Sequence, residues 1–90
     1  MITTIILINA ERKKINQAGT QLAAIDGVTE VYSVSGRFDL VAIIRHKSIE
    51  DISEIVTAKI AEVDGILKTE SMIAYRMLSK YDVASLFDME

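Results

Sequence analysis

The residues best suited to bind a charged ligand lie in and just after one short turn. A Ser-Gly-Arg sequence at 35–37 separates two segments rich in β-branched and aromatic residues, 28–34 and 38–46, and Asp39 follows it. This pattern predicts a hairpin in which Gly36 takes the positive φ that a tight turn needs. Aspartate is a poor strand former, so Asp39 requires a local partner. Two interpretations stay open: Asp39 accepts backbone N–H groups at the turn, or its carboxylate and the Gly36 backbone form a small polar pocket for an ammonium or carboxylate group.

The other residue types with catalytic or metal-binding potential are too scattered for a reaction centre. His46 is the only histidine, between Arg45 and Lys47, and no residue with metal-ligand spacing stands near it. The chain has no cysteine, its serines lack the glycine pattern of a nucleophile elbow, and its four glycines are too far apart for a phosphate loop. We therefore expect a binding or assembly module, without catalytic residues, a metal or another cofactor.

Composition limits the class of protein further. Ninety residues make one small domain, and half of them are hydrophobic, with a mean hydropathy of +0.28. No apolar run is long enough to span a membrane, and the start of the chain lacks the basic region of a signal peptide. With no cysteine, this composition fits a cytoplasmic protein. The formal net charge is -3 and the one basic cluster is residues 12–14, so we do not expect direct nucleic-acid binding.

The hydrophobic pattern predicts the elements that must position the turn. Residues 2–9 are apolar on both alternating faces, as in a central strand, and residues 66–78 predict a long last strand. Apolar residues at helical spacing predict helices over 11–25 and 48–63. The expected buried positions are Ile15, Ala18, Leu22 and Ile25 in the first helix and Ile49, Ile52, Ile55, Val56, Ile60 and Val63 in the second.

Capping residues mark where these helices begin and end. We expect Asn9 to cap the first helix, and Ser48, with Asp51 three residues later, to begin the second with a capping-box pattern. Gly27 and Gly65 are suited to the left-handed conformation that ends a helix. A further helix start is expected at residues 79–82, followed by a short apolar tail.

An internal repeat indicates the fold. AAIDGV, which ends at Val28, recurs as AEVDGI, which ends at Ile66. The chain is therefore two β-α-β units in tandem, an α+β ferredoxin-like βαββαβ arrangement. Right-handed crossovers place the first and third strands side by side in the centre. The second and fourth strands lie at the edges, where the charged residues Glu30, Lys68, Glu70 and Arg76 belong.

Two helices can cover only one face of such a sheet. The central strands nevertheless present apolar side chains to both faces, and soluble monomers rarely expose a large apolar patch. At roughly 25 cal/mol per Å², covering several hundred Å² is worth on the order of 10 kcal/mol before the costs of association. We therefore expect a two-fold dimer, sheet against sheet, with the apolar tail making a further contact with a neighbour.

The segments DGVTEVYSVSGRFDLVAII and DGILKTESMIAY, within this element order, resemble the effector-binding domain of the Lrp/AsnC transcription regulators. The most specific feature is a glycine followed three residues later by an aspartate, Gly36 and Asp39. The resemblance covers residues 1–78 and leaves 79–90 as a tail, expected to be a short helix docking on a neighbouring subunit. It implies a dimeric α/β barrel that assembles into a tetramer of dimers, an octamer, and binds an amino acid or related effector between dimers. The implied ligand-binding residues are Ser35, Gly36, Arg37, Phe38, Asp39, Thr69 and Ser71.

Members of this family usually carry an N-terminal helix-turn-helix domain, whereas the first strand here begins at Ile2. The resemblance therefore implies a stand-alone effector domain that modulates transcription by co-assembling with a full-length Lrp/AsnC regulator. Three alternatives stay open. One is a small dimeric α/β-barrel oxygenase or isomerase, which should place Tyr32 and Arg76 in a closed cavity. The second is an ACT-like amino-acid sensor, although the Asn9-Ala10-Glu11 sequence lacks the glycine which that fold favours there. The third is a purely structural oligomerisation module.

Overall fold

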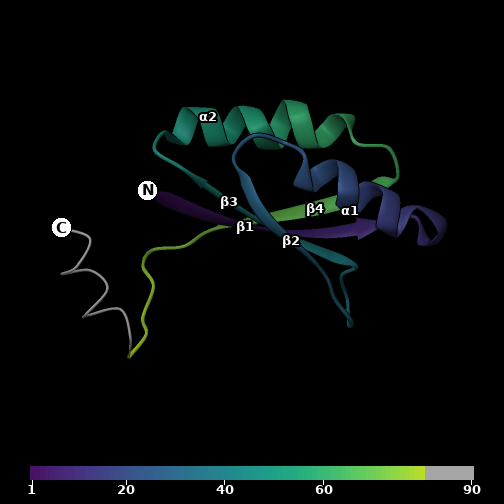
Figure 1. The fold of residues 1–90 in the computed structure, drawn as a ribbon, viewed down its shortest axis with the longest axis horizontal. Coiled ribbons are helices and arrows are strands. Elements are labelled where there is room, and N and C mark those ends of the chain that lie inside the picture. Colours follow the sequence, from purple (N-terminus) through teal and green to yellow (C-terminus); the bar gives the residue numbers. More distant parts are fainter. Residues whose placement is uncertain (81–90) are drawn as a thin grey trace.

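The structure, a computed structural model, describes residues 1–80; the predicted helix start at 79–82 and the apolar tail lie largely outside these residues. Four strands form one antiparallel sheet in the order β2-β3-β1-β4, and both helices lie on the same side of it (Figure 1). The fold is therefore the predicted ferredoxin-like βαββαβ arrangement, with the first and third strands in the centre. The strands are β1 (Ile2–Ala10), β2 (Val28–Ser33), β3 (Leu40–His46) and β4 (Ile66–Ile73).

The core lies between the sheet and the helices. Alternate residues of β1 point into it, and the fully buried Ile6 and Ile8 pair with Ala42 and Leu40 on β3. Helix α1 (Ile15–Ala23) adds Ala18 and Leu22, and the second helical segment adds Ile52, Ile55 and Ile60. The predicted burial of these five helix residues is confirmed, and the predicted positions Ile15, Ile25, Val56 and Val63 are partly buried against the core. The prediction that Ile49 is buried is wrong, because its side chain is 49% exposed at the start of the second helix.

The first helix begins later than predicted. A 3₁₀ turn, η1 (Arg12–Lys14), precedes α1, and Glu11 rather than Asn9 occupies the cap position, with no side-chain capping bond. Asn9 belongs to β1, and its side-chain amide bonds to the loop between β2 and β3 instead. The prediction failed because Asn9 is equally able to cap a helix and to hold a loop.

The second helix begins as predicted at its cap residue, Ser48. The Ser48 hydroxyl accepts the backbone N–H groups of Glu50 and Asp51 in the first turn of α2 (Ile49–Glu54). The helix then continues through a π-helical turn, η2 (Ile55–Lys59), and a 3₁₀ turn, η3 (Ile60–Glu62). Both helical segments end before a glycine with positive φ, Gly27 at 95° and Gly65 at 94°, so the two halves of the repeat are also alike in backbone conformation.

Two strand boundaries differ from the prediction. The hairpin connection is not a tight turn at 35–37 but a loop over 34–39, closed by a bond from Val34 N–H to Asp39 O of 3.0 Å. The last strand ends at Ile73 rather than at residue 78, so Arg76 is not an edge-strand residue. The N–H of Ala74 bonds to Thr3 O near the start of β1, and after this bond the chain turns away from the sheet (Figure 1).

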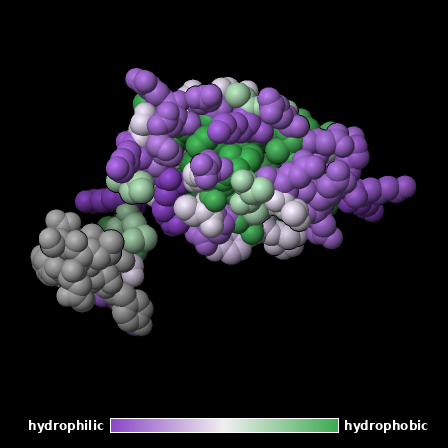
Figure 2. All heavy atoms as spheres, turned by 45° about the horizontal axis from the view of Figure 1, so that its top comes forward, coloured by the Kyte–Doolittle hydropathy of each residue, from purple (hydrophilic) through white to green (hydrophobic). Residues whose placement is uncertain are grey.

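The face of the sheet turned away from the helices carries a row of apolar side chains. We call this set the open-face cluster: Ile5, Leu7, Val41, Ile43 and Met72, which the pairing registers place on one face. The side chains of the four central-strand members are partly exposed, and Met72 is 47% exposed. The helix side, turned forward in Figure 2, is mostly hydrophilic, with hydrophobic residues visible in its middle. Within residues 1–80 no helix is long and apolar enough to cross a membrane.

Candidate functional site

The loop between β2 and β3 is held against the end of β1. The N–H of Asp39 donates to Ile8 O at 2.8 Å, and the N–H of Ala10 donates to Asp39 Oδ2 at 2.9 Å. The side-chain amide of Asn9 donates to Arg37 O at 2.7 Å. Asp39 therefore accepts a backbone N–H group, as the first interpretation required, but the N–H belongs to the neighbouring strand. This bond compensates for the poor strand propensity of aspartate.

The tip of this loop is open. The side chains of Ser35 and Arg37 are exposed, and Phe38 is partly buried. Gly36 has a φ of 109°, and no atom lies within 4 Å of the position that a Cβ would take. The glycine is thus required by its backbone conformation and not by lack of space.

Beside the loop lies a shallow depression with side chains of both charges. It is lined by Asn9, Arg37, Phe38, Lys68 and Glu70. Lys68 and Glu70 reach it because they stand opposite Asn9 and Leu7 of β1, on the open face. The two cations suit a carboxylate and Glu70 suits an ammonium group, the two charges of an amino acid.

Sequence reasoning did not assign Asn9, Lys68 or Glu70 to the site. Alternation along β4 was the available signal, because residues 68 and 70 must share one face of a strand. That signal is usable only once the side of the sheet on which the loop lies is known.

Thr69 and Ser71 lie on the other face of β4. They stand opposite Ile8 and Ile6, whose side chains are fully buried on the helix side. Ser71 lines a mostly apolar hollow between β4 and α2, together with Ile49, Val56 and Ile73. The structure therefore brings Arg37 and Phe38 of the loop together with Lys68 and Glu70. Ser35, Gly36 and Asp39 are not among the residues that line the depression, and within one chain neither are Thr69 and Ser71.

A second polar group on the open face joins β2 to β3. The Tyr32 hydroxyl donates to the Glu30 carboxylate, and Arg45 lies 3.2 Å from Glu30. The hydrogen bond from the Tyr32 hydroxyl lowers the pKa of Glu30 most, and the hydrogen bond from Arg45 lowers it further. The same bond to Glu30 raises the pKa of Tyr32. Arg76 lines a hollow together with Arg45, Tyr75 and Met77. Tyr32 is not among the residues that line this hollow. The pair expected of an oxygenase or isomerase thus does not share this hollow.

The part of the chain that the structure describes contains no group of three histidine, aspartate or glutamate side chains arranged to hold a metal ion. The chemistry that the loop and the depression offer is hydrogen bonding and charge pairing.

Comparison with known proteins identifies the family. The sequence profile described as "Lrp/AsnC ligand binding domain" matches residues 3–83. An uncharacterized HTH-type transcriptional regulator of Pyrococcus furiosus is 34% identical over 79 residues, which are 88% of this chain and 53% of that protein. The chain spans about half, or less, of the length of the first curated relatives it matches.

Solved structures show the same fold. The crystal structure of TTHA0845 from Thermus thermophilus has a TM-score of 0.83 and 36% identity, covering 89% of this chain and 100% of that one. The feast or famine regulatory protein Rv3291c of M. tuberculosis, solved in complex with L-methionine, has a TM-score of 0.74 and 20% identity over 90% of this chain and 54% of that one. From its profile match, its relatives and its fold, the chain belongs to the Lrp/AsnC ligand-binding domain family.

Proposed function

We propose that this chain is a non-enzymatic effector domain, which binds an amino acid at the 35–39 loop and modulates transcription through assembly with DNA-binding members of its family. The observation that carries the proposal is the loop itself, fixed to the end of β1 by Asp39 and Asn9 beside a depression with both signs of charge. A preorganised polar site of this kind loses little entropy when a small zwitterion binds. The L-methionine in the complex of the M. tuberculosis protein belongs to the same ligand class.

The open-face cluster supports a proposed assembly of copies. Its side chains remain partly exposed on the face of the sheet turned away from the helices, and a second copy offers the same apolar face for a two-fold contact. We propose this dimer as the basic unit and a tetramer of dimers as the higher assembly.

Assembly also gives Thr69 and Ser71 their place in the proposal. These hydroxyls lie across β4 from the depression, so in a ligand site that includes them they are supplied by another copy. An effector that bridges two copies in this way changes the stability of the assembly by mass action.

The test of effector binding is calorimetric titration of the full chain with each of the twenty amino acids. We expect one or a few of them to bind, and Asp39→Asn to weaken that binding by about tenfold through loss of a charge. Asp26→Asn is the matched control, because Asp26 is an exposed carboxylate away from the loop. No heat and no thermal shift with any amino acid contradicts the sensing role.

A complementation experiment tests the shared site. Asp39→Asn and the double variant Thr69→Val, Ser71→Ala are each expected to bind weakly. If the two sets of residues come from different copies, mixing the variants restores a fraction of intact sites. Unchanged weak binding in the mixture contradicts sharing.

Two further results separate the proposal from its alternatives. Recovery of a helix-turn-helix relative with the tagged chain from its native cells supports the regulatory role, and recovery of no such protein counts against it. A chain that assembles but binds no small molecule is a purely structural oligomerisation module.

A further inference from the structure

The start of α2 contains half of a capping box and a histidine in place of the other half. In a complete box the first residue caps the helix with its hydroxyl, and the acidic residue three positions later accepts the N–H of that first residue. Here the Ser48 hydroxyl makes its part of the box, accepting the N–H groups of Glu50 and Asp51 at 3.2 and 3.3 Å. The Ser48 N–H, however, donates to His46 Nδ1 at 3.2 Å and not to Asp51.

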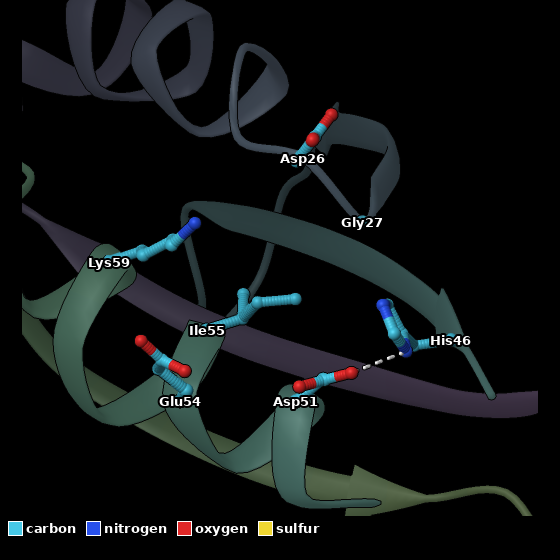
Figure 3. Close-up of a pocket in the computed structure, with 7 residues that line it drawn as sticks. All are labelled: Asp26, Gly27, His46, Asp51, Glu54, Ile55 and Lys59. Carbon is cyan, nitrogen blue, oxygen red and sulfur yellow. Dashed lines mark ion pairs between the residues drawn. The ribbon is translucent and has the colours of Figure 1, made fainter. Parts of the chain in front are cut away.

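The same histidine nitrogen lies beside the Asp51 carboxylate, whose place as acceptor of the Ser48 N–H it takes. His46 Nδ1 is 3.5 Å from Asp51 Oδ2, as the dashed line in Figure 3 shows. Because Nδ1 accepts the Ser48 N–H, it carries no proton in this arrangement, and the ring proton is on Nε2. A proton added to Nδ1 would face the Ser48 N–H, donor against donor, while Asp51 Oδ2, at 3.5 Å, could accept the added proton.

Charged side chains of both signs surround His46. The pocket in Figure 3 is lined by carboxylates from two elements, Asp26 from the turn after α1 and Asp51 and Glu54 from α2, with Lys59 of η2 as its one cation. The neighbouring Arg45 directs its guanidinium to Thr29 and Glu30 on the open face, and Lys47 follows His46 in the chain. The His46 side chain is 35% exposed, so protons reach it from solvent.

We propose that His46, Ser48 and Asp51 form a proton-operated cap of α2. When His46 is neutral, its Nδ1 accepts the Ser48 N–H. When a proton binds Nδ1, that hydrogen bond breaks and the imidazolium pairs with Asp51. The Ser48 N–H then donates its hydrogen bond to the Asp51 carboxylate, which completes the capping box. Histidine is the side chain whose ordinary titration falls in the physiological range, which suits it to an exchange of this kind. The device is independent of the effector site, since none of its residues belongs to the 35–39 loop or the depression beside it.

Nitrogen-detected NMR of the ¹⁵N-labelled full chain, from about pH 8 to about pH 5, tests this cap. We expect an Nε2–H tautomer at the upper end and a Ser48 amide resonance that shifts with the same midpoint as the His46 ring. In His46→Gln the Ser48 amide loses that pH dependence. A neutral ring protonated on Nδ1, or a Ser48 amide that does not follow the ring, overturns the proposal.

Two charge-removing variants distinguish the capping box from general electrostatics. In Asp51→Asn at low pH the Ser48 N–H loses its charged acceptor, so its hydrogen exchange is expected to be faster by roughly tenfold. Glu54→Gln removes a charge from the same pocket and leaves Ser48 exchange unchanged, because Glu54 lies one turn further along α2. Equal effects of the two substitutions overturn the assignment of Asp51 as the second acceptor.

Discussion

At the scale of single residues, Asp39 joins the loop to the sheet. Its Oδ2 is the acceptor for Ala10 N–H, and its own N–H extends the pairing of β3 with β1. Asp39→Ala leaves the partly buried Ala10 N–H without an acceptor, and we expect it to lower the free energy of unfolding by about 1 to 2 kcal/mol. Urea denaturation followed by circular dichroism measures the loss.

Asp39→Asn is the matched variant, because the amide oxygen can still accept the Ala10 N–H. It should cost less than half as much stability as Asp39→Ala while removing the charge that the proposed ligand binding uses. Equal losses from both substitutions would show that the carboxylate charge, and not the hydrogen bond, holds the loop.

Thr4 offers a change in the opposite direction. It is 1% exposed in the core face of β1, and its Oγ1 has no hydrogen-bond partner among the described residues. Thr4→Val replaces this hydroxyl with a methyl group of similar shape, so we expect a gain of about 1 kcal/mol and a higher Tm. Calorimetric melting checks this, with Thr3→Val, on the open face, as a control for strand propensity. A lower Tm for Thr4→Val would contradict the unpaired state of the hydroxyl.

The residue chemistry of the loop was predictable only in part. Gly36 and Asp39 are recognisable because a glycine at a hairpin and an aspartate in an apolar strand each require an explanation. The partner of Asp39 was not predictable, since the N–H of Ala10 is distant in sequence and meets it only through the pairing of β1 with β3. Lys68 and Glu70 were recognised as charged edge residues, but their position beside the loop depends on the same tertiary pairing.

At the scale of elements, each of the two helical segments ends at a glycine, Gly27 or Gly65. The surroundings of these two glycines differ from those of Gly36 in the loop. A Cβ on Gly65 would lie 2.7 Å from Lys14 Cβ, whereas a Cβ on Gly36 would meet nothing within 4 Å. Gly36→Ala therefore costs only backbone strain, about 1 kcal/mol. Gly65→Ala adds a clash with a backbone-proximal atom and should cost about 2 kcal/mol or more. Chemical denaturation of the two variants tests this order, and equal losses contradict it.

Element types were predictable from periodicity, whereas their ends depended on partners. The apolar spacing of 48–63 and the cap at Ser48 gave the second helix, because both signals are local. The signals that determine the ends of β1 and β4 are not local in the sequence. Asn9 stays in β1 because β4 and the loop bond to it, and β4 stops at Ile73, which pairs with Thr4 near the start of β1.

At the scale of the whole molecule, the proposed association of copies depends on the open-face cluster. Ile43→Glu places a charge in the middle of the proposed two-fold contact, where each copy would bury it without a partner. We expect this variant to weaken the dimer by at least tenfold, with little effect on the fold of one chain, because the side chain is partly exposed there. Leu67→Glu is the matched control, since Leu67 is 65% exposed and outside the cluster. Equal dissociation of both variants would place the contact elsewhere.

The ferredoxin-like topology and the two-sided apolar centre were predictable because the repeat and the strand composition both report on the whole chain. The division of the proposed ligand residues between the two faces of β4 was not predictable, since a family resemblance names residues without saying on which face of the sheet they lie. Thr69 and Ser71 illustrate this, because register alone places them opposite buried residues of β1.

The central claim is that the uncovered side of the sheet meets a second copy of the chain. Sedimentation equilibrium of the full chain at micromolar concentration tests it most directly. We predict a species of at least twice the 10.0 kDa of one chain. A single species of 10.0 kDa would contradict the dimer and, with it, the ligand sites shared between copies.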